Sequence, residues 1–499
     1  MNGYRLSGML ALALRTLLYT IALVTGAAGT PAAPQLLFEQ ISVEQGLSQS
    51  IVNFIMQDRR GYLWFGTEDG LNLYDGYGFS VLRSDPDDPF SLSYNQITAL
   101  YEDRSGSIWA GTFNGGLNRY LLEKNRFIRY RAAAADPTSL SHDLVYAIVQ
   151  DLNGRLLVGC DRGLNRMKPP GNADEPALFD RFFHDPAGAG SLGNDRVRAL
   201  AIDSSGTLWA GTDRGLAMLP AAELLLEKPR FTPLPAEGEG WSSLARDTIR
   251  TLMVDRAGAL WIGAVHGLHC LRMEPGRTPR LQSFLHDPAD PRTLSNSNVY
   301  ALLEDRDGYI WIGTDGGLNR YDPRSGDMAA WRNDPRDPHS LSHNEIRSLF
   351  QDRSGLLWVG TYGGGVSKAD ARPKPFVHYR YLPEVPEGLS QPIIWSIYED
   401  ANGILWIGTH GGGLDRLERR TGRYTHYRAN PADPHSLSHN IVRLVIPGRD
   451  GELWIGTHGG GICRFNPATG RFVRYLHDPQ NPYSLCHNEI RALFLDSDS

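Results

Sequence analysis

Short runs of alternating apolar and polar residues, each ended by a glycine-containing turn, recur from about residue 36 onward. In one copy such a run begins at Ile346, a D-x-x-G turn follows, and the run L-W-V-G-T comes next. Glycine accepts the positive φ that such turns require, and aspartate can bond the turn backbone. The two-residue period predicts β-strands, and the glycines in every copy exclude helical repeats.

A longer phrase close to D-x-x-G-x-L-W-I-G-T-x-x-G-L-x-R repeats at intervals of 45 to 52 residues. Glycine stands three residues before and two residues after its tryptophan position in all nine copies. Aspartate stands six residues before it in eight copies, and Gly448 is the exception. Each copy predicts four short strands, which is the size of a propeller blade. The tryptophan position is filled by Trp64, Trp109, Leu157, Trp209, Trp261, Trp311, Trp358, Trp406 and Trp454.

The tryptophan of each copy is expected to face the neighbouring blade and to hold the ring together. A tryptophan side chain buries about 150–250 Å². At about 25 cal/mol per Å² this burial is worth roughly 4–6 kcal/mol before entropy is subtracted. Leu157 fills the position in the third copy, so that seam is expected to bury less area.

A second-order repeat predicts where one ring ends. Residues 45–51 read QGLSQSI and residues 387–393 read EGLSQPI, whereas the other copies enter through S-L-S-H-N or a variant of it. The two phrases are 342 residues apart, and seven tryptophan positions lie from Trp64 to Trp358. We therefore expect an all-β fold, with a seven-bladed β-propeller of four-stranded blades over residues 34–375. The Pro-rich stretch 371–375 is the expected linker.

Residues 376–499 are expected to form the first two to three blades of a second, incomplete propeller. A tenth copy of the phrase begins at His487, and the sequence stops inside it. A propeller that lacks most of its blades exposes sheet edges to water. The pattern therefore favours the front part of a longer protein, and a degenerate or wrongly ended reading frame stays open as the alternative.

The amino terminus, residues 1–33, is typical of a secretory signal. Arg5 and Arg15 precede an apolar run over 16–28, and small residues follow up to Ala33. The run is short for a membrane span, which needs about 20 apolar residues. We expect a cleaved signal rather than an uncleaved anchor or a cytoplasmic protein. The rest of the chain is then soluble and periplasmic or otherwise extracytoplasmic.

Composition narrows the function classes. The chain has 50 Lys and Arg against 56 Asp and Glu, and the net charge of -6 argues against a nucleic-acid-binding face. Hydrophobic residues at 41% and charged residues at 21% exclude wholesale disorder. Four cysteines are too few for a disulfide scaffold and form no C-x-x-C pair. We expect buried free thiols at Cys160, Cys270, Cys463 and Cys486.

Three phrases near the start resemble two-component regulator propeller proteins. They are Phe38 with residues 46–49 (GLSQ), residues 57–67 (QDRRGYLWFGT), and residues 70–76 (GLNLYDG). The resemblance covers nearly all of residues 36–499. It implies two seven-bladed propellers outside the membrane, normally followed by an immunoglobulin-like domain, a transmembrane helix and a cytoplasmic output domain.

The output domain that the resemblance implies is often a histidine kinase, a hybrid kinase or a diguanylate cyclase. No histidine-kinase box, GGDEF phrase or second span occurs in this sequence. We therefore expect an extracytoplasmic ligand-sensing module and no enzyme activity in this chain. The expected partners are a small-molecule or oligosaccharide ligand and a membrane-linked signalling protein, and homodimerisation stays open. A secreted propeller enzyme acting on glycans as a lyase or hydrolase, and a passive interaction scaffold, are the alternatives.

One face of the ring is expected to carry the candidate ligand site. The blade-to-blade loops and the turns between second and third strands lie on the same face of a propeller, and concave ring mouths suit small ligands. The residue after each G-T should therefore line the rim of the central channel. These residues are Glu68, Phe113, Asp213, Asp315, Tyr362, His410 and His458.

Several other features of this face have a structural explanation. The S-H-N histidines, such as His343, His439 and His487, are expected to pack on the next blade while the serine and asparagine cap the loop. A zinc site from His410 and His458 would need a third ligand, and no metal or other cofactor is expected. The D-x-x-G-x-L-W phrase is similar to the Asp-boxes of sialidases, which are hairpin turns and imply no catalysis. The G-G-G turns lack the Gly-Lys-Ser/Thr of a phosphate loop.

Overall fold

The computed structural model describes residues 36–168, 177–188, 190–232, 234, 241–273, 279–372, 379–383, 385 and 387–496. The expected signal at 1–33 and residues 373–375 of the predicted linker lie outside this range. Two compact units are present. The first holds the described residues from 36 to 372 except 335–337, and the second holds 335–337 and the described residues after 378. Among the described residues, no helix has the length and apolar character needed to cross a membrane.

The first unit is built of seven antiparallel sheets, numbered here in chain order. Sheet 1 contains β2 (Val52–Gln57), β3 (Leu63–Thr67), β4 (Gly70–Tyr74) and β5 (Phe79–Leu82). Sheet 2 contains β6 (Ile97–Glu102), β7 (Ile108–Thr112), β8 (Leu117–Leu121) and β9 (Arg126–Tyr130). Sheet 3 contains β10 (Val145–Gln150), β11 (Leu156–Cys160), β12 (Gly163–Lys168) and β13 (Leu178–Phe182). Sheet 4 contains β14 (Val197–Ile202), β15 (Leu208–Thr212) and β16 (Gly215–Leu219).

The remaining sheets of the first unit follow the same order. Sheet 5 contains β17 (Ile249–Val254), β18 (Leu260–Ala264), β19 (Gly267–Arg272) and β20 (Arg280–Phe284). Sheet 6 contains β21 (Val299–Glu304), β22 (Ile310–Thr314), β23 (Gly317–Tyr321) and β24 (Met328–Trp331). Sheet 7 contains β25 (Ile346–Gln351), β26 (Leu356–Thr361), β27 (Val366–Asp370) and the early strand β1 (Glu39–Ile41).

The second unit contains two sheets. Sheet 8 contains β28 (Ile394–Glu399), β29 (Ile404–Thr409), β30 (Leu414–Glu418) and β31 (Arg423–Tyr427). Sheet 9 contains β32 (Val442–Pro447), β33 (Leu453–Thr457), β34 (Ile462–Asn466) and β35 (Arg471–Tyr475). The helical segments are short: Val43–Gln45, Leu122–Lys124, Glu223–Leu225, Trp241–Leu244 and Arg449–Gly451.

The all-β propeller fold class is confirmed, with one exception to the four-stranded pattern. Sheet 4 has three strands, and its fourth is reduced to a single bridge between Met218 and Thr232. Pro220 ends the third strand and lacks the N–H that a sheet ladder needs. A 3-10 turn follows there, and its Leu224 and the later Phe231 fill the core at this position.

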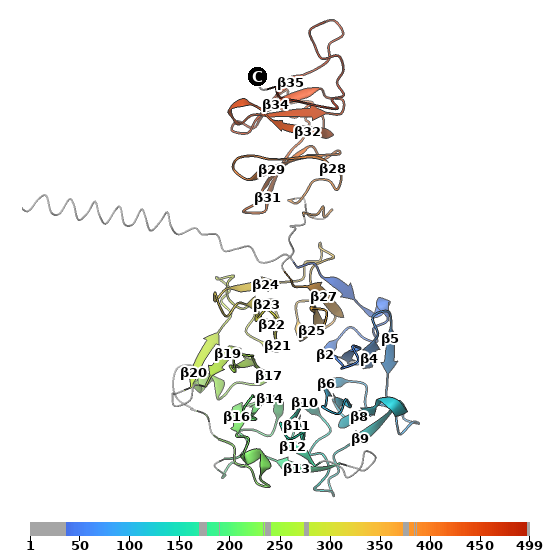
Figure 1. The fold of residues 1–499 in the computed structure, drawn as a ribbon, viewed down its shortest axis with the longest axis vertical. Helices are drawn as coiled ribbons and strands as arrows, with labels where there is room; N and C mark the ends of the chain where they lie inside the picture. The colour runs from blue at the N-terminus through green and yellow to red at the C-terminus, as the bar shows by residue number, and fades with distance from the viewer. Residues whose placement is uncertain are drawn as a thin grey trace, which may run out of the picture. The chain divides into compact units, whose positions relative to one another are not determined.

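The seven sheets of the first unit surround a centre lined by their first strands (Figure 1). Each first strand contacts the first strand of the next sheet, and β25 of sheet 7 contacts β2 of sheet 1. Strand β1 pairs with β27, with Gln40 opposite Ser367, so residues from the start of the described chain complete the last sheet. This arrangement is consistent with the expected seven-bladed ring.

Arginines at the turn after the first strand repeat the same contact from sheet to sheet. Arg59 of sheet 1 donates to the carbonyl oxygen of Asp103 in sheet 2 at 2.9 Å. Arg353 of sheet 7 donates to the carbonyl oxygens of Asp58 and Arg59 at 2.9 Å each, across the join between the last and first sheets. The join therefore has the same hydrogen bonds as an ordinary seam.

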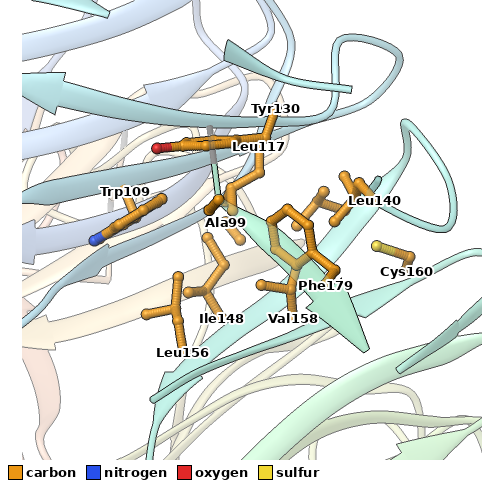
Figure 2. Packing of buried hydrophobic residues seen from close by; sticks show 12 residues of the cluster. Ala99, Trp109, Leu117, Tyr130, Leu140, Ile148, Leu156, Val158, Cys160 and Phe179 are labelled. Atoms are coloured by element: carbon orange, nitrogen blue, oxygen red, sulfur yellow. The ribbon is translucent and has the colours of Figure 1, made fainter. Parts of the chain in front are cut away.

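The repeated tryptophan lies at the seam between sheets, as expected. Trp64 is fully buried and its ring centroid lies 5.7 Å from that of Tyr120 in sheet 2. Figure 2 shows the next seam, where Trp109 and Tyr130 of sheet 2 face Ile148 and Leu156 of sheet 3. The glycine of G-T permits this approach, because a Cβ on Gly66 would come within 2.6 Å of Ile97 Cγ2.

The repeated aspartate and tryptophan are also bonded to each other. In sheet 6, Trp311 Nε1 donates to Asp305 Oδ2 at 2.7 Å, while Asp305 Oδ1 accepts the turn N–H groups of Asp307 and Tyr309 at 3.0 Å each. The same tryptophan bond occurs in seven sheets at 2.7 to 3.1 Å. Where Leu157 replaces tryptophan, Asp151 instead accepts from Arg155 Nε at 2.7 Å.

All four cysteines are free thiols. Cys160, Cys270 and Cys463 are buried as expected, and burial raises the pKa of Cys160 to about 12. The expectation was wrong for Cys486, which is exposed. Cys486 lies in the loop after sheet 9, and no further sheet covers that loop among the described residues.

Candidate functional site

A β-bulge in the first strand of each sheet of the first unit aims one side chain at the channel. In each first strand the pairing register skips the second residue, so this residue has no partner on the second strand. Bulges of this kind re-aim side chains and are common beside functional sites. In the first unit the skipped residues are Asn53, Thr98, Tyr146, Arg198, Arg250, Tyr300 and Arg347. We call these seven residues the collar.

The collar residues line a cavity of about 380 Å³ together with the mainly apolar residues that follow them in the seven first strands. A cavity of this volume lies within the range of small-ligand sites. Phe113, Asp315 and Tyr362, which follow G-T, lie at the same end of the channel, because their backbone N–H groups bond to the residue just before the first strand. Asp315 N donates to Asn298 O, for example, and Tyr362 N donates to Glu345 O.

On one arc of the collar, sheets 3 and 4 form a charged network. Tyr146 OH donates to Asp161 Oδ1 at 2.9 Å, and Arg196 bridges Asp161 to Asp213, with 2.9 Å between Arg196 Nη1 and Asp213 Oδ2. Arg198 also pairs with Asp213, and its guanidinium carbon lies 4.9 Å from the ring centroid of Tyr146. Every charge in this arc therefore has an opposite partner.

A second arc spans sheets 5 to 7 and contains less fully partnered cations. The guanidinium carbons of Arg250 and Arg347 lie 4.6 and 4.2 Å from the ring centroid of Tyr300. Arg250 Nε donates to Asn298 Oδ1 at 2.9 Å, and Asn298 donates in turn to Asp315 Oδ2 at 2.7 Å. Among the described residues no carboxylate pairs with Arg250. Arg347 pairs with Glu345 but leaves its buried Nε without a hydrogen-bond partner.

The surroundings shift the pKa values of the collar tyrosines and of one carboxylate. Burial raises the pKa of Tyr146 to about 12, and its bond to Asp161 adds to this effect. Burial likewise raises the pKa of Tyr300. For Asp161, burial alone would raise the pKa, but the bonds from Arg196 and Tyr146 outweigh it and leave the pKa lowered. Asp161 therefore stays ionised and the tyrosines stay neutral near neutral pH.

The residues predicted from the sequence fall into three groups. Asp213, Asp315 and Tyr362 join the collar network, and the guanidinium carbon of Arg347 lies 4.7 Å from the Tyr362 ring centroid. Glu68 is half-buried and accepts from Gln96 Nε2 at 3.2 Å, whereas Phe113 is 46% exposed.

His410 and His458 belong to the second unit and lie in different surroundings. The His410 ring centroid lies 6.0 Å from that of Trp395, the bulge residue of sheet 8. His458 Nδ1 lies 3.5 Å from Glu489 Oε1. Within the described residues no group of three or more His, Cys, Asp or Glu side chains could hold a metal ion.

The S-H-N loop residues have structural roles that differ in part from those expected. The histidines cap their own loop, since Nδ1 of His343 accepts from Glu345 N at 3.0 Å and Nδ1 of His439 accepts from Ile441 N at 3.1 Å. The asparagines also cap, as Asn440 Oδ1 accepts from Ala429 N at 2.7 Å. The prediction that serine and asparagine alone act as caps is therefore incomplete.

The collar residues themselves were missed by the sequence analysis. Their signal is the second residue of each first strand, which varies among Asn, Thr, Tyr and Arg while the residue before it is always Val or Ile. A regular strand would place this residue in the ladder, and only the bulge turns it toward the channel.

Comparison with known proteins agrees with this architecture. The model of the two component regulator propeller family matches residues 46–69, 91–114, 191–214, 293–316, 340–363 and 388–411. The extracellular domain of a putative hybrid two component system from B. thetaiotaomicron has 25% identity and a TM-score of 0.72, over 93% of this chain and 57% of that one. The extracellular domain of a putative one component system from the same organism has 22% identity and a TM-score of 0.52, over 91% and 55%.

A curated relative also matches over a short stretch. Histidine kinase P4 from Formosa agariphila is 47% identical over 57 residues, which is 11% of this chain and 4% of that protein. The chain thus spans somewhat more than half of the first similar solved structure and a small part of the curated relative.

Proposed function

We propose that this chain, whose repeats are those of the two component regulator propeller family, is the extracytoplasmic ligand-sensing part of a membrane-linked signalling protein. The likeness to an extracellular domain of a hybrid two component system over 93% of the chain supports this role. Ligand binding would favour one arrangement of the sensing region over another and so shift the population that the output part reads.

The observation that carries the proposal for the first unit is the collar with its cavity of about 380 Å³. Tyr146 and Tyr300 line this cavity with aromatic rings that carry guanidinium groups, and the guanidinium–carboxylate pairs offer fixed donors and acceptors beside them. Aromatic faces with convergent polar groups suit a small polyhydroxylated ligand. The ligand class is therefore an oligosaccharide that enters the collar with its end unit.

Calorimetric titration of the full chain with a panel of defined di- to tetrasaccharides tests this function. Saturable binding without turnover of the sugar is the expected result. Tyr300→Ala and Arg250→Ala should weaken that binding at least tenfold, while Arg104→Ala, whose guanidinium bonds to Leu152 O at a seam, should leave it unchanged.

Two results would contradict the proposal in different ways. Cleavage of any of these sugars would reject a sensor without catalysis and favour the secreted glycan enzyme. Unchanged binding after both collar substitutions would show that the ligand binds outside the channel of the first unit.

A further inference from the structure

In sheets 2, 3 and 9 the loop before the first strand packs on the fourth strand of its own sheet, and an arginine fills the space between them. Arg129 of sheet 2 donates through Nε to Ser91 O at 2.8 Å and through Nη2 to Asp88 O at 2.8 Å. Its Nη2 also contacts Ser91 Oγ at 2.6 Å. Arg181 of sheet 3 and Arg474 of sheet 9 make the equivalent contacts with their own loops.

We call this set of loop acceptors the guanidinium socket: two backbone carbonyl oxygens and one hydroxyl oxygen that converge on one arginine. Planar guanidinium groups match such convergent acceptors through several N–H groups at once. Sheet 7 uses a smaller amide at this position, because Gln40 Nε2 donates to Ser340 O at 3.1 Å. In these four sheets the socket is thus occupied from within the chain.

Sheet 6 has the socket but not the arginine. Ala330 stands opposite Asn319, as Arg129 stands opposite Asn118 in sheet 2. The loop keeps the same internal hydrogen bonds, since Thr293 Oγ1 accepts from Asp287 N at 2.9 Å and donates to Asp290 O at 2.8 Å. The carbonyl oxygens of Asp290 and Thr293 therefore take the places of those of Asp88 and Ser91.

A cavity of about 840 Å³ occupies the position of the absent side chain, and Asp290, Thr293 and Ala330 line it. The arginines that border this cavity make other contacts. Arg292 pairs with Asp290 at 3.0 Å, and Arg332 Nε donates to Gly316 O at 3.1 Å.

Two carboxylates at this cavity also favour a cation. Arg320, another lining residue, lies with its guanidinium carbon 4.2 Å from the Tyr309 ring centroid. Asp287 and Asp327 line the cavity as well. No cation pairs with either of these carboxylates within the described part of the chain. Asp290 O accepts from Thr293 N and Thr293 Oγ1, as Asp88 O accepts from Ser91, but it lacks the arginine donor that Asp88 O has in addition. This missing donor and the unpaired carboxylates both favour a cationic group.

We propose that the socket of sheet 6 binds a guanidinium group brought by another molecule. The ligand class is an arginine side chain or a small alkylguanidinium compound, held by the carbonyl oxygens of Asp290 and Thr293. The cavity is far larger than the guanidinium itself, so it can admit the flanking atoms of a peptide. This site is separate from the collar, and its ligand is independent of the sensing function proposed above.

Titration of the full chain with ethylguanidinium tests the proposal, with ethylammonium as the matched cation that lacks the planar fork. We expect saturable binding of ethylguanidinium in the millimolar range, because one small group forms few contacts. Ala330→Arg should fill the socket from within and weaken binding at least tenfold, whereas Ala330→Ser should retain it. If Ala330→Arg fails to fold, Ala330→Gln tests the same blockage with the side chain that sheet 7 uses.

The reverse substitution creates a second socket and gives an independent readout. Arg129→Ala should lower the melting temperature, and ethylguanidinium but not ethylammonium should restore it. The stoichiometry of ethylguanidinium should also rise from one to two. Arg181→Ala repeats this test in sheet 3 if Arg129→Ala does not fold.

Two further ligands distinguish the sources of the guanidinium. Agmatine stands for a small metabolite, and acetyl-Gly-Arg-Gly-amide stands for a peptide. Tighter binding of the tripeptide would assign the site to an arginine side chain, and tighter binding of agmatine would assign it to a small compound. No saturable binding of ethylguanidinium to the unaltered protein, or equal binding to Ala330→Arg, would overturn the proposal.

Discussion

Phe38→Ala should open the join between sheets 7 and 1, because this side chain anchors the strand that completes sheet 7. Phe38 is 1% exposed and packs in one cluster with Trp311 of sheet 6 and Leu357 of sheet 7. Its backbone N–H donates to His339 O at 2.9 Å. The adjoining strand β1 has only three register pairs with β27, so the ladder alone is a weak attachment.

The expected cost follows from the burial of the ring. Replacing a buried phenylalanine by alanine costs about 3–5 kcal/mol, including the cavity left behind. The full area of a phenylalanine at about 25 cal/mol per Å² gives a similar upper bound. We expect Phe38→Ala to lower the free energy of unfolding of the first unit by this amount and to remove the hydrogen-exchange protection of β1.

The matched control is Phe127→Ala, at the equivalent position of sheet 2. Phe127 is 4% exposed, and its N–H donates to Phe90 O at 2.7 Å, as that of Phe38 does to His339 O. Urea unfolding followed by tryptophan fluorescence gives the free energies, and exchange mass spectrometry gives the protection. Phe127→Ala should destabilise to a similar degree but leave β1 protected. If Phe38→Ala changes the unfolding free energy by less than about 1 kcal/mol and β1 stays protected, the join does not depend on this strand.

Three further predictions concern the core, the collar and the thiols. Asp305→Ala should lower the free energy of unfolding by about 2–3 kcal/mol, because it leaves Trp311 Nε1 and two turn N–H groups without acceptors. Urea unfolding measures this loss, and substitution of the exposed Asp307 by alanine serves as the control. The pKa of Asp161 is lowered in the folded state, so its ionised form stabilises the fold. The unaltered protein should therefore melt at a higher temperature than Asp161→Asn near neutral pH, and this difference should shrink below about pH 4. A difference that persists in acid would show that the charge of Asp161 does not cause it. A thiol reagent should titrate Cys486 alone in the native protein and all four cysteines after unfolding, and a rapid native reaction of Cys160 would show that its burial is transient.

The parts of the fold that the sequence predicted are those that local chemistry repeats in each copy. The glycines and aspartate of D-x-x-G predict the turn, and the tryptophan position predicts a seam residue. The bond from Trp311 to Asp305 was not predicted, although the two residues occur together in seven copies. The third copy keeps the aspartate as Asp151 and lacks the tryptophan, and the ninth keeps Trp454 and has Gly448. Because two of the nine copies lack one of the two residues, their co-occurrence does not show that they bond to each other. A turn that favours aspartate and a seam that favours tryptophan would give the same pattern.

The candidate site was predicted only in part for a different physical reason. The residue after G-T lies in a turn whose place on the ring follows from propeller topology, so Asp213 and Asp315 could be assigned to the channel mouth. Arg250 and Tyr300 lie inside strands, where a two-residue period assigns each side chain to one of two faces. The bulge breaks that period by one residue and turns both side chains toward the channel. The sequence of one strand does not show that a residue is left unpaired, because the bulge depends on the register with the neighbouring strand.

The repeats offer their own series of substitutions at equivalent backbone positions, and this series separates structural from functional residues. Asn118 and Asn319 hold the same loop serine N–H in sheets 2 and 6, at 3.0 and 2.8 Å, so identity there reflects the fold. At the collar the backbone is the same in every sheet, but the side chain changes from Asn53 to Arg347. Ala330 differs in kind, because the backbone socket persists while the side chain that fills it elsewhere is absent. Sheet 6 keeps these acceptors and lacks the arginine, which is the basis for proposing that another molecule supplies the guanidinium.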